Sequence, residues 1–480
     1  MMNGNEEMRN ETTAMNRTDL IIIGAGPGGY RAAELAAKAG LKVVVFEAGH
    51  VGGTCLNEGC IPTKSFARNA EILQTLEEAS LFGMNNMSFD FDFRQVVARK
   101  NEVLAQLRSG IETLLSHPNI TLVRDHARFV GPHTVEAFSV GSGSAAAQYT
   151  APYIIIATGS VPKTLRLQEP ANCRVLDSSD LLQLDHLPES LCIIGAGVIG
   201  MEFASIFSAF GTKVTVVEFL KECLPALDSD IAKRLRKVLE KRCVTFHLQC
   251  AVTGIRSKEV TFTDKKGKEQ SIEAEEVLMA VGRAPRVSDD FQLAGFDYDA
   301  RTGIKVDDHY ETTVPGIYAI GDVNGRQMLA HAAEAQAKIA VTHILHTSNA
   351  PANSQFSILH SQFTVVPAAI FTYPEAACVG PTEDQLKEEG IAYECRKAFH
   401  RANGKALAMN ETEGMLKLLS EPDGGRILGC HVFGAHAADM VQEVSVLMCR
   451  DTTVAQLRDM VHIHPTLSEI VLAAAEQQTA

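Results

Sequence analysis

The sequence predicts an α/β protein with two Rossmann-like dinucleotide-binding domains and a further domain at the C-terminal end. A pattern of strand, glycine loop, helix and second strand occurs twice along the chain. In both copies an acidic residue follows the first glycine by 23 positions, from Gly24 to Glu47 and from Gly195 to Glu218. The 480 residues are enough for about three domains of roughly 150 residues each. A third domain therefore follows the second nucleotide-binding domain.

Composition narrows the class of protein. Hydrophobic residues make up 46% of the chain, and the formal net charge is −14 without blocks of Lys and Arg, which predicts no nucleic-acid partner. No apolar run approaches the roughly 20 residues that span a bilayer, so no membrane association is expected. Eleven cysteines, an odd number and mostly scattered, favour a reducing compartment, the cytoplasm. Residues 1–17 are polar and resemble no targeting segment, so we expect a disordered extension, with Met15 as a second candidate start.

The first nucleotide-binding pattern begins with the apolar run Leu20–Ile23, typical of a buried parallel strand. The glycines Gly24, Gly26 and Gly29 follow with G-x-G-x-x-G spacing. A helix is expected from Tyr30 to Ala39 and a second strand from Lys42 to Phe46, which ends at Glu47. Such glycines permit a tight turn and let the backbone approach a pyrophosphate at the N-terminus of the helix.

The second pattern repeats this arrangement with Gly195, Gly197, Gly200 and Glu218. One G-x-G-x-x-G alone is also found as a simple glycine turn, but two copies in full strand–helix–strand context predict that the chain binds two dinucleotides. A carboxylate at the end of the second strand accepts hydrogen bonds from ribose and repels a 2′-phosphate. Glu218 therefore favours NAD over NADP, although Lys221 is a basic residue nearby.

Two cysteines, Cys55 and Cys60, stand close together in "VGGTCLNEGCIPTKS", residues 51–65. Their spacing is wide for a zinc pair and no second pair accompanies them, which argues against a structural zinc site. Two small buried residues near a helix start are a second interpretation. The third interpretation is a redox-active pair. Pro62 suits an early helical position before the helix expected from Ser65. A helix N-terminus lowers the pKa of a thiol, which favours the reactive thiolate.

The segment "GGTCLNEGCIPTK" resembles the active-site disulfide of the pyridine nucleotide–disulfide oxidoreductases, and its C-L-N-x-G-C-I-P form is most similar to the dihydrolipoyl dehydrogenase branch of that family. The resemblance covers residues 18–475. It includes, in order, "IIIATGS" (154–160), "AVGRAP" (280–285), "GIYAIGDV" (316–323), "LAHAAEAQ" (329–336) and "HIHPTLSE" (462–469).

This resemblance implies that FAD occupies the first nucleotide-binding domain and NAD the second. It implies a Cys55–Cys60 disulfide, with Cys60 next to the flavin and Cys55 as the thiol that meets the substrate. Lys64 would lie near the flavin N5 and pair with Glu202, although a solvent-facing helix position is an alternative for Glu202. The further residues that would contact FAD are Thr158, Gly159, Asp322, Ala330 and Ala127. Those that would contact NAD are Val252, Gly282 and Arg283.

The last motif places His464 before Pro465, which disfavours helical geometry at the histidine. In the family this histidine is the base that exchanges a proton with the substrate-facing thiol, and a glutamate, here Glu469, orients it. Thr466 and Glu469 also match a T-x-x-E capping box, so capping is an alternative role for Glu469. The resemblance implies a homodimer whose C-terminal domain, expected to be an α+β interface domain, completes the active site of the other subunit.

The motifs predict an FAD-binding domain over 18–159, an NAD-binding domain over 160–283, a central segment over 284–356 that packs with the FAD domain, and an interface domain over 357–480. Residues 139–148 are expected to form a hairpin tip, and 346–355 a linker. The implied enzyme oxidises dihydrolipoyl-lysine and reduces NAD⁺. No lipoyl domain precedes residue 18, so the expected partner is a lipoyl-bearing acyltransferase subunit or the lipoyl carrier protein of glycine cleavage. The alternatives are an NAD(P)H-dependent disulfide or metal reductase and a non-catalytic flavoprotein subunit.

Overall fold

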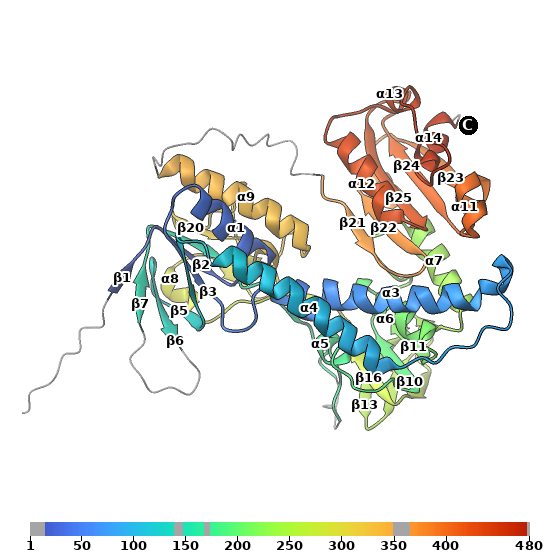
Figure 1. Cartoon of the computed structure of the whole chain (residues 1–480), viewed down its shortest axis with the longest axis horizontal. Coiled ribbons are helices and arrows are strands. Elements are labelled where there is room, and N and C mark those ends of the chain that lie inside the picture. Colours follow the sequence, from blue (N-terminus) through green and yellow to red (C-terminus); the bar gives the residue numbers. More distant parts are fainter. Residues whose placement is uncertain (1–14, 139–146, 168–172, 349–364, 478–480) are drawn as a thin grey trace, which may run out of the picture. The chain divides into compact units, whose positions relative to one another are not determined.

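A computed structural model describes residues 15–138, 147–167, 173–348 and 365–477 (Figure 1). The chain forms two compact units, each assembled from three segments that are distant in the sequence. The first unit contains residues 1–57, 105–161 and 284–358, and the second contains 58–104, 162–283 and 359–480. Four elements include a boundary between units: α2 (Gly53–Glu58), α4 (Phe93–Leu115), β9 (Ser160–Pro162) and β17 (Arg283–Pro285).

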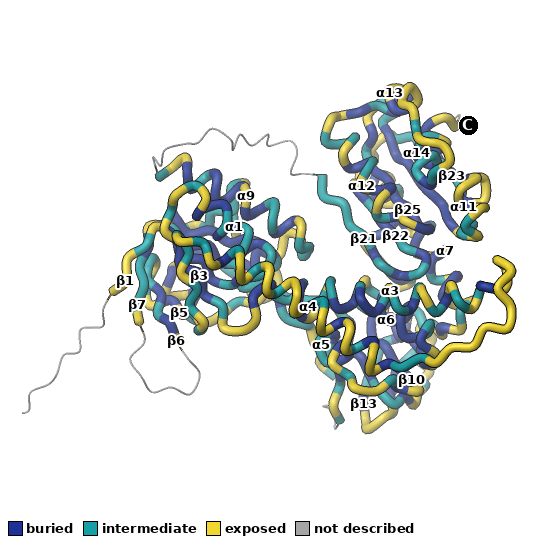
Figure 2. Tube along the Cα trace, viewed as in Figure 1, coloured by how far each residue is buried: buried dark blue, intermediate teal, exposed yellow. Residues whose placement is uncertain are grey.

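The first unit is built on a five-stranded parallel sheet with the order β20-β8-β2-β3-β4. The strands are β20 (Ile317–Ala319), β8 (Tyr153–Ile156), β2 (Leu20–Ile23), β3 (Val43–Phe46) and β4 (Ile120–Val123). The central strands β2 and β3 are buried along their whole length, as Figure 2 shows, and their runs of Leu, Ile, Val and Phe suit a sheet covered on both faces. The helices α1 (Pro27–Lys38) and α9 (Ala330–Thr347) pack together against one face.

The other face of this sheet packs against a second apolar cluster that contains Phe129, Phe291 and Phe296. Smaller elements complete the unit. These are the four-stranded sheet β1 (Met15–Arg17), β7 (Gln148–Thr150), β6 (Thr134–Phe138) and β5 (His126–Gly131), the helices α8 (Phe291–Ala294) and η2 (Gly321–Asn324), and the strand pair β18 (Tyr298–Asp299) and β19 (Gly303–Ile304).

The second unit contains a parallel sheet with the order β12-β11-β10-β16. Its strands are β12 (Thr245–Leu248), β11 (Lys213–Glu218), β10 (Ser190–Ile194) and β16 (Glu276–Met279). Its other elements are α3 (Cys60–Glu77), η1 (Ala79–Phe82), α5 (Ser178–Leu181), α6 (Val198–Ala209), α7 (Ser229–Lys241) and the antiparallel strands β13 (Ala251–Arg256), β14 (Glu259–Thr263) and β15 (Glu269–Glu273). Helix α3 packs against α6 around an aromatic core that includes Phe66 and Phe207.

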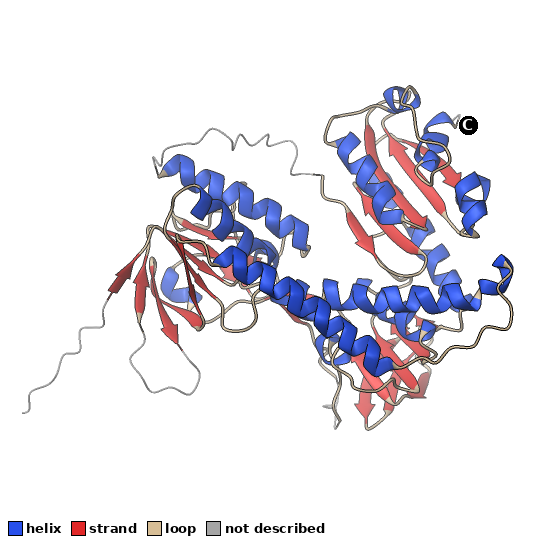
Figure 3. Cartoon of the chain, viewed as in Figure 1, coloured by secondary structure: helices blue, strands red, loops and turns tan. Residues whose placement is uncertain are grey.

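The C-terminal part of the second unit is an antiparallel sheet with helices, shown in red and blue in Figure 3. The sheet order is β21 (Ala368–Ile370), β22 (Glu375–Val379), β25 (Ile427–Gly434), β24 (Met415–Ser420) and β23 (Glu394–Phe399). The helices are α10 (Glu383–Glu389), η4 (His400–Ala402), α11 (Gly404–Met409), α12 (Ala437–Met448), α13 (Val454–Arg458) and α14 (Glu469–Glu476). Two parallel nucleotide-binding sheets and a C-terminal α+β part confirm the predicted fold class.

Several boundaries differ from the sequence expectations. Helix α1 begins at Pro27 rather than Tyr30, since proline is favoured in the first helical turn. Helix α3 begins at Cys60 rather than Ser65. Met15–Arg17 pair with β7 instead of belonging to a disordered extension. Of the expected extension, hairpin tip and linker, residues 1–14, 139–146 and 349–355 lie outside the described residues.

Candidate functional site

The first glycine loop is shaped by contacts within the protein. A Cβ atom on Gly24 would overlap the carbonyl oxygen of Ala157, and one on Gly29 would overlap the carbonyl oxygen of Gly24. A Cβ on Gly26 would meet only the Cα of Gly53, at 3.7 Å, which is ordinary contact. The first and third glycines are thus required by packing, whereas the protein itself places no such demand on the second.

The second glycine loop has the same geometry. Gly195 and Gly200 are required by neighbouring carbonyl oxygens, while a Cβ on Gly197 would meet no protein atom within 4 Å. The N-cap residues Gly26 and Gly197 have nearly identical backbone angles, with φ −73° in both and ψ −174° and −173°. Neither α1 nor α6 has a side-chain cap or an acidic residue in its first turn, so their N-terminal N–H groups stay available to an anion.

The acidic residues after the second strands hold these loops. Glu47 accepts the backbone N–H groups of Ala25 and Gly49, both at 2.9 Å. Glu218 accepts the N–H groups of Ala196 at 2.5 Å and Leu220 at 2.7 Å. Each carboxylate oxygen has a second lone pair, which leaves both residues able to accept a ribose hydroxyl. Open helix N-termini, an unrestricted second glycine and a carboxylate at the strand end together fit a dinucleotide in both loops.

Apart from Lys64, which is in the second unit, the other residues predicted for FAD lie in the first unit around its sheet. Asp322, in η2, accepts a hydrogen bond of 2.5 Å from Ser160. The hydroxyl of Thr158 donates to the carbonyl of Arg286 at 2.9 Å, and the carbonyl of Gly159 accepts the N–H of the same arginine at 2.9 Å. Ala330 is the first residue of α9, and Ala127 is in β5.

The other residues predicted for NAD lie in the second unit. Val252 is in β13 and pairs with Phe262 of β14. The carbonyl of Gly282 accepts the N–H of Lys163 at 2.9 Å, and Arg283 begins β17 directly after this glycine. Gly282 has a φ of +101°, a conformation that L side chains rarely adopt, so glycine is needed at this turn.

The two cysteines stand at helical positions. Cys55 is half-buried in α2, whereas Cys60 is exposed and is the first residue of α3. The partial positive charge of a helix N-terminus favours a thiolate at Cys60. Cys55 belongs to the first unit and Cys60 to the second.

Lys64 and Glu202 form an ion pair across two helices of the second unit. Nζ of Lys64 in α3 lies 2.8 and 2.9 Å from the two carboxylate oxygens of Glu202 in α6. The Glu202 side chain is only 6% exposed, so the alternative of a solvent-facing glutamate is wrong. A buried carboxylate is stable in its charged form when cationic and N–H donors surround it.

His464 and Glu469 also lie together. Nδ1 of His464 is 2.8 Å from Oε1 of Glu469, while Oε2 accepts the backbone N–H of Thr466 at 2.8 Å. Helix α14 begins at Glu469 after Ser468, and the hydroxyl of Thr466 donates to Ile463 instead of capping the helix. A complete capping box is therefore absent here, and the glutamate contacts the histidine directly.

His462, two residues earlier, has a different environment. Its side chain is 7% exposed, and its Nε2 lies 2.9 Å from Glu443 in α12. The His464 side chain is 79% exposed. Of these two histidines, His464 is the one open to a substrate or a partner surface.

The structure adds residues that sequence reasoning missed. Asn57, between the two cysteines, is buried and donates to the carbonyls of Val51 at 3.1 Å and Gly53 at 2.8 Å. Its side-chain oxygen accepts a hydrogen bond from Arg108 in α4. Its place inside the cysteine motif was the only signal for Asn57, and no local pattern points to Arg108. Asn57 holds the loop that carries the cysteines.

Tyr30 and Glu334 are a second missed pair. The Tyr30 hydroxyl in α1 donates to Glu334 in α9 at 2.9 Å. Burial and the neighbouring Glu334 carboxylate raise the pKa of Tyr30, and Cys55 contributes in the same direction. Tyr30 thus stays neutral within electrostatic reach of Cys55.

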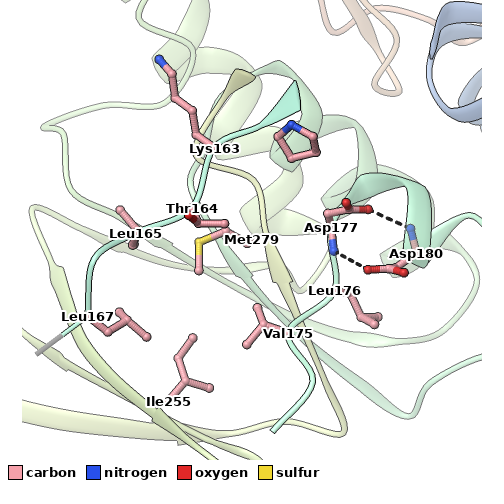
Figure 4. A pocket seen from close by; sticks show the side chains of 11 residues that line it. Lys163, Thr164, Leu165, Leu167, Val175, Leu176, Asp177, Asp180, Ile255 and Met279 are labelled. Carbon is pink, nitrogen blue, oxygen red and sulfur yellow. Dashed lines mark hydrogen bonds between the residues drawn. The ribbon is translucent and has the colours of Figure 1, made fainter. Parts of the chain in front are cut away.

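A cavity of about 380 Å³ lies in the second unit, and its lining includes Lys163, whose backbone N–H donates to Gly282 (Figure 4). Its wall is mostly apolar, and the carboxylates of Asp177 and Asp180 at its edge cap α5, as the dashed lines show. Among the described residues, no group of three His, Cys, Asp or Glu side chains is placed to hold a metal ion. In the same part of the chain, every helix is too short or too polar to cross a membrane.

Comparisons with known proteins agree with this geometry. Residues 18–337 match the family model "Pyridine nucleotide-disulphide oxidoreductase", and residues 366–475 match its dimerisation domain. The chain is 36% identical to a dihydrolipoyl dehydrogenase of Geobacillus stearothermophilus, covering 96% of both chains, and 35% identical to one of Mycoplasma pneumoniae, covering 94% of this chain and 96% of the relative.

Two solved structures are also similar. The copper(II) complex of the HOCl-induced flavoprotein disulfide reductase RclA from Escherichia coli has a TM-score of 0.83 at 29% identity, covering 96% of this chain and 99% of the other. LpdA from Mycobacterium tuberculosis has a TM-score of 0.83 at 26% identity, with the same coverage of each chain.

Two dinucleotide loops in one chain, a cysteine pair at a helix start and a histidine–glutamate pair define an oxidoreductase that uses FAD and NAD. With both family models matched, the chain belongs to the pyridine nucleotide-disulphide oxidoreductase family.

Proposed function

We propose that this protein is a dihydrolipoyl dehydrogenase. It oxidises dihydrolipoyl-lysine on a carrier protein to the lipoyl disulfide and reduces NAD⁺ to NADH, releasing one proton. The His464–Glu469 contact carries the proposal, because oxidation of a dithiol substrate needs a base. The similarity of this chain to dihydrolipoyl dehydrogenases over nearly its whole length supports the same function.

In the proposed reaction, Cys55 and Cys60 form the disulfide that a substrate thiolate attacks at Cys55. His464 takes the proton of that thiol through Nε2, since Nδ1 donates to Glu469. The second substrate thiolate then displaces Cys55, which leaves a lipoyl disulfide and two reduced protein cysteines. FAD bound in the first glycine loop would supply the redox chemistry that reoxidises this dithiol and reduces NAD⁺.

The cofactor contacts follow from the loops. Gly24, Gly26, Gly29 and Glu47 would hold the pyrophosphate and ribose of FAD, and Gly195, Gly197, Gly200 and Glu218 those of NAD. Lys64 and Glu202 are assigned to the flavin side of the site. The remaining contacts to FAD are assigned to Thr158, Gly159, Asp322, Ala330 and Ala127, and those to NAD to Val252, Gly282 and Arg283.

A homodimer is supported by the dimerisation-domain match over residues 366–475. We propose that each active site is shared, with Cys55 and Cys60 from one subunit and His464 from the other. The high exposure of His464 within a single chain supports this assignment. The proposed domains are 18–159 for FAD, 160–283 for NAD, 284–356 as the central segment and 357–480 for the interface.

The proposed partner is a lipoyl-bearing protein, either an acyltransferase subunit or the glycine-cleavage carrier. Buried thiols at Cys192, Cys223, Cys250 and Cys430 support a reducing compartment, and we propose the cytoplasm.

The decisive experiment is an assay of the purified yellow protein with dihydrolipoamide and either NAD⁺ or NADP⁺. Oxidation of dihydrolipoamide with NAD⁺ is expected. No reaction with dihydrolipoamide, together with NAD(P)H-dependent reduction of another disulfide or of a metal ion, would favour a reductase instead.

A further inference from the structure

The turn between β21 and β22 contacts the second nucleotide-binding fold. Figure 1 shows this turn beside α3 and α6. The backbone N–H of Tyr373 donates to the hydroxyl of Ser205 in α6 at 3.0 Å, and Arg242 donates to the carbonyl of Tyr373 at 2.7 Å. These two contacts, together with those of Phe371 described next, join a segment of the C-terminal part to the fold predicted for NAD.

Phe371 touches both members of the Lys64–Glu202 pair. Its backbone N–H donates to Oε1 of Glu202 at 2.9 Å. Its ring lies under the Lys64 ammonium, with Nζ 4.6 Å from the ring centroid. One residue of the C-terminal part therefore contacts the carboxylate through its backbone and the ammonium through its side chain.

The physical effect of both contacts is to restrict the charged groups. The face of an aromatic ring carries partial negative charge and attracts an ammonium. The Glu202 carboxylate, almost fully buried, accepts both the Lys64 ammonium and the Phe371 N–H, so two different elements fix its orientation. The Lys64 side chain is 32% exposed, and without the ring its long flexible chain would have more open space to sample.

We propose that Phe371 is a positioning residue for the Lys64–Glu202 pair, through which the C-terminal part of the chain fixes the lysine ammonium on the flavin side of the active site. The proposal rests on the proposed function only for the place of Lys64 beside the flavin. The contacts among Phe371, Lys64 and Glu202 do not depend on that function.

Three variants of the full-length holoenzyme test the proposal. Phe371→Leu removes the ring but keeps an apolar side chain, and Phe371→Tyr keeps the ring. Phe399→Leu is the matched control, because the guanidinium of Arg401 lies 4.7 Å from the Phe399 ring in the same C-terminal part, so an equivalent cation–ring contact is lost elsewhere. Flavin content and thermal unfolding confirm that each variant is folded.

The first measurement is the rate at which an amine-selective reagent modifies Lys64, followed by mass spectrometry at fixed pH. Loss of a cation–ring contact is expected to raise this rate about 3- to 30-fold in Phe371→Leu. Phe371→Tyr should behave like the wild type, and Phe399→Leu should leave the rate at Lys64 unchanged. Equal rates at Lys64 in the wild type and Phe371→Leu would overturn the proposal.

The second measurement separates turnover from substrate binding with dihydrolipoamide and NAD⁺. The proposal expects kcat of Phe371→Leu to fall, the KM for dihydrolipoamide to stay unchanged, and Phe371→Tyr to restore kcat. Faster labelling of Lys64 with an unchanged kcat would overturn the positioning role. A wild type that does not oxidise dihydrolipoamide would contradict the proposed function, while the labelling rates would still decide whether Phe371 holds Lys64.

Discussion

Nδ1 of His464 lies 2.8 Å from Oε1 of Glu469, five residues further along the chain. The backbone N–H of Thr466 and then the His464 imidazole lower the pKa of Glu469, so its carboxylate stays ionised at neutral pH. A carboxylate can only accept, so Nδ1 carries the proton and Nε2 is the basic nitrogen. Glu469 thereby sets which nitrogen of His464 meets a substrate.

The first prediction concerns this base. His464→Ala should lower kcat with dihydrolipoamide by about 10²- to 10⁴-fold, the usual contribution of a positioned general base. Flavin content should stay normal, because His464 lies outside the segments predicted to bind FAD. Steady-state kinetics and the flavin-to-protein absorbance ratio measure the two effects.

His436→Asn is the matched control for that substitution. His436 is exposed and has a φ of +56°, which asparagine tolerates better than most residues. Its kcat should match the wild type. A His464→Ala enzyme with full turnover would rule out the base assignment.

The second prediction tests the shared active site. Cys55→Ala and His464→Ala homodimers should each be inactive, and exchanging their subunits should restore activity. A mixed dimer would contain one site with both residues and one with neither, by the two-fold symmetry of a homodimer. Random exchange makes about half of the dimers mixed, so about a quarter of wild-type activity is expected. Proven exchange without recovery would place both residues of a site in one subunit.

The third prediction concerns nucleotide choice. Glu218→Ala should weaken NAD⁺ binding by about 1–3 kcal/mol, because polar contacts to ribose are lost. The same change frees the N–H groups of Ala196 and Leu220, so Glu218→Gln, which keeps an acceptor for one of them, should lose less. Isothermal titration calorimetry with NAD⁺ measures the loss of affinity in both variants.

Phe219→Arg extends this test, since Phe219 is 72% exposed and tolerates a polar side chain. An arginine beside the ribose site should shift the ratio of kcat/KM values toward NADP⁺. A wild-type preference for NADP⁺ would show that the argument from Glu218 is wrong.

The fourth prediction concerns acid stability. Burial alone would raise the pKa of Glu383, but hydrogen bonds from Lys387, Lys417 and Tyr393 outweigh it and lower the pKa to about 2. A lowered pKa in the folded state contributes stability above the ordinary value near 4.5, and this contribution is lost as pH falls toward 2. Glu383→Gln should therefore cost on the order of 2–3 kcal/mol of unfolding free energy at pH 6.

The cost of Glu383→Gln should shrink as pH approaches 2, and urea unfolding at pH 6 and pH 3 measures the trend. Glu388→Gln, at an exposed position of the same helix α10, is the control and should change stability little at either pH. A cost that is the same at pH 6 and pH 3 would show that Glu383 does not have the lowered pKa.

The nucleotide-binding loops were predictable from sequence because their geometry is local. Gly24 and Gly29 are five residues apart, and Gly29 is required by the backbone of Gly24 itself. Strand, turn and helix follow one another directly, so apolar periodicity and glycine spacing are sufficient evidence for them. His464 and Glu469 are equally close in sequence, which made their pairing predictable, although the sequence left open whether Glu469 instead capped the helix.

Only the tertiary structure decided the contacts between distant elements. Lys64 and Glu202 are 138 residues apart, and Phe371 is 169 residues beyond Glu202. Family resemblance suggested the Lys64–Glu202 pair. Nothing near Phe371 in the sequence indicates contact with a lysine. Lys64 and Phe371 meet only because α3 and the β21–β22 turn both pack on α6. Local chain geometry thus determined the two glycine loops proposed to bind nucleotides, and burial of separate elements against one another determined which charges are held beside the proposed flavin site.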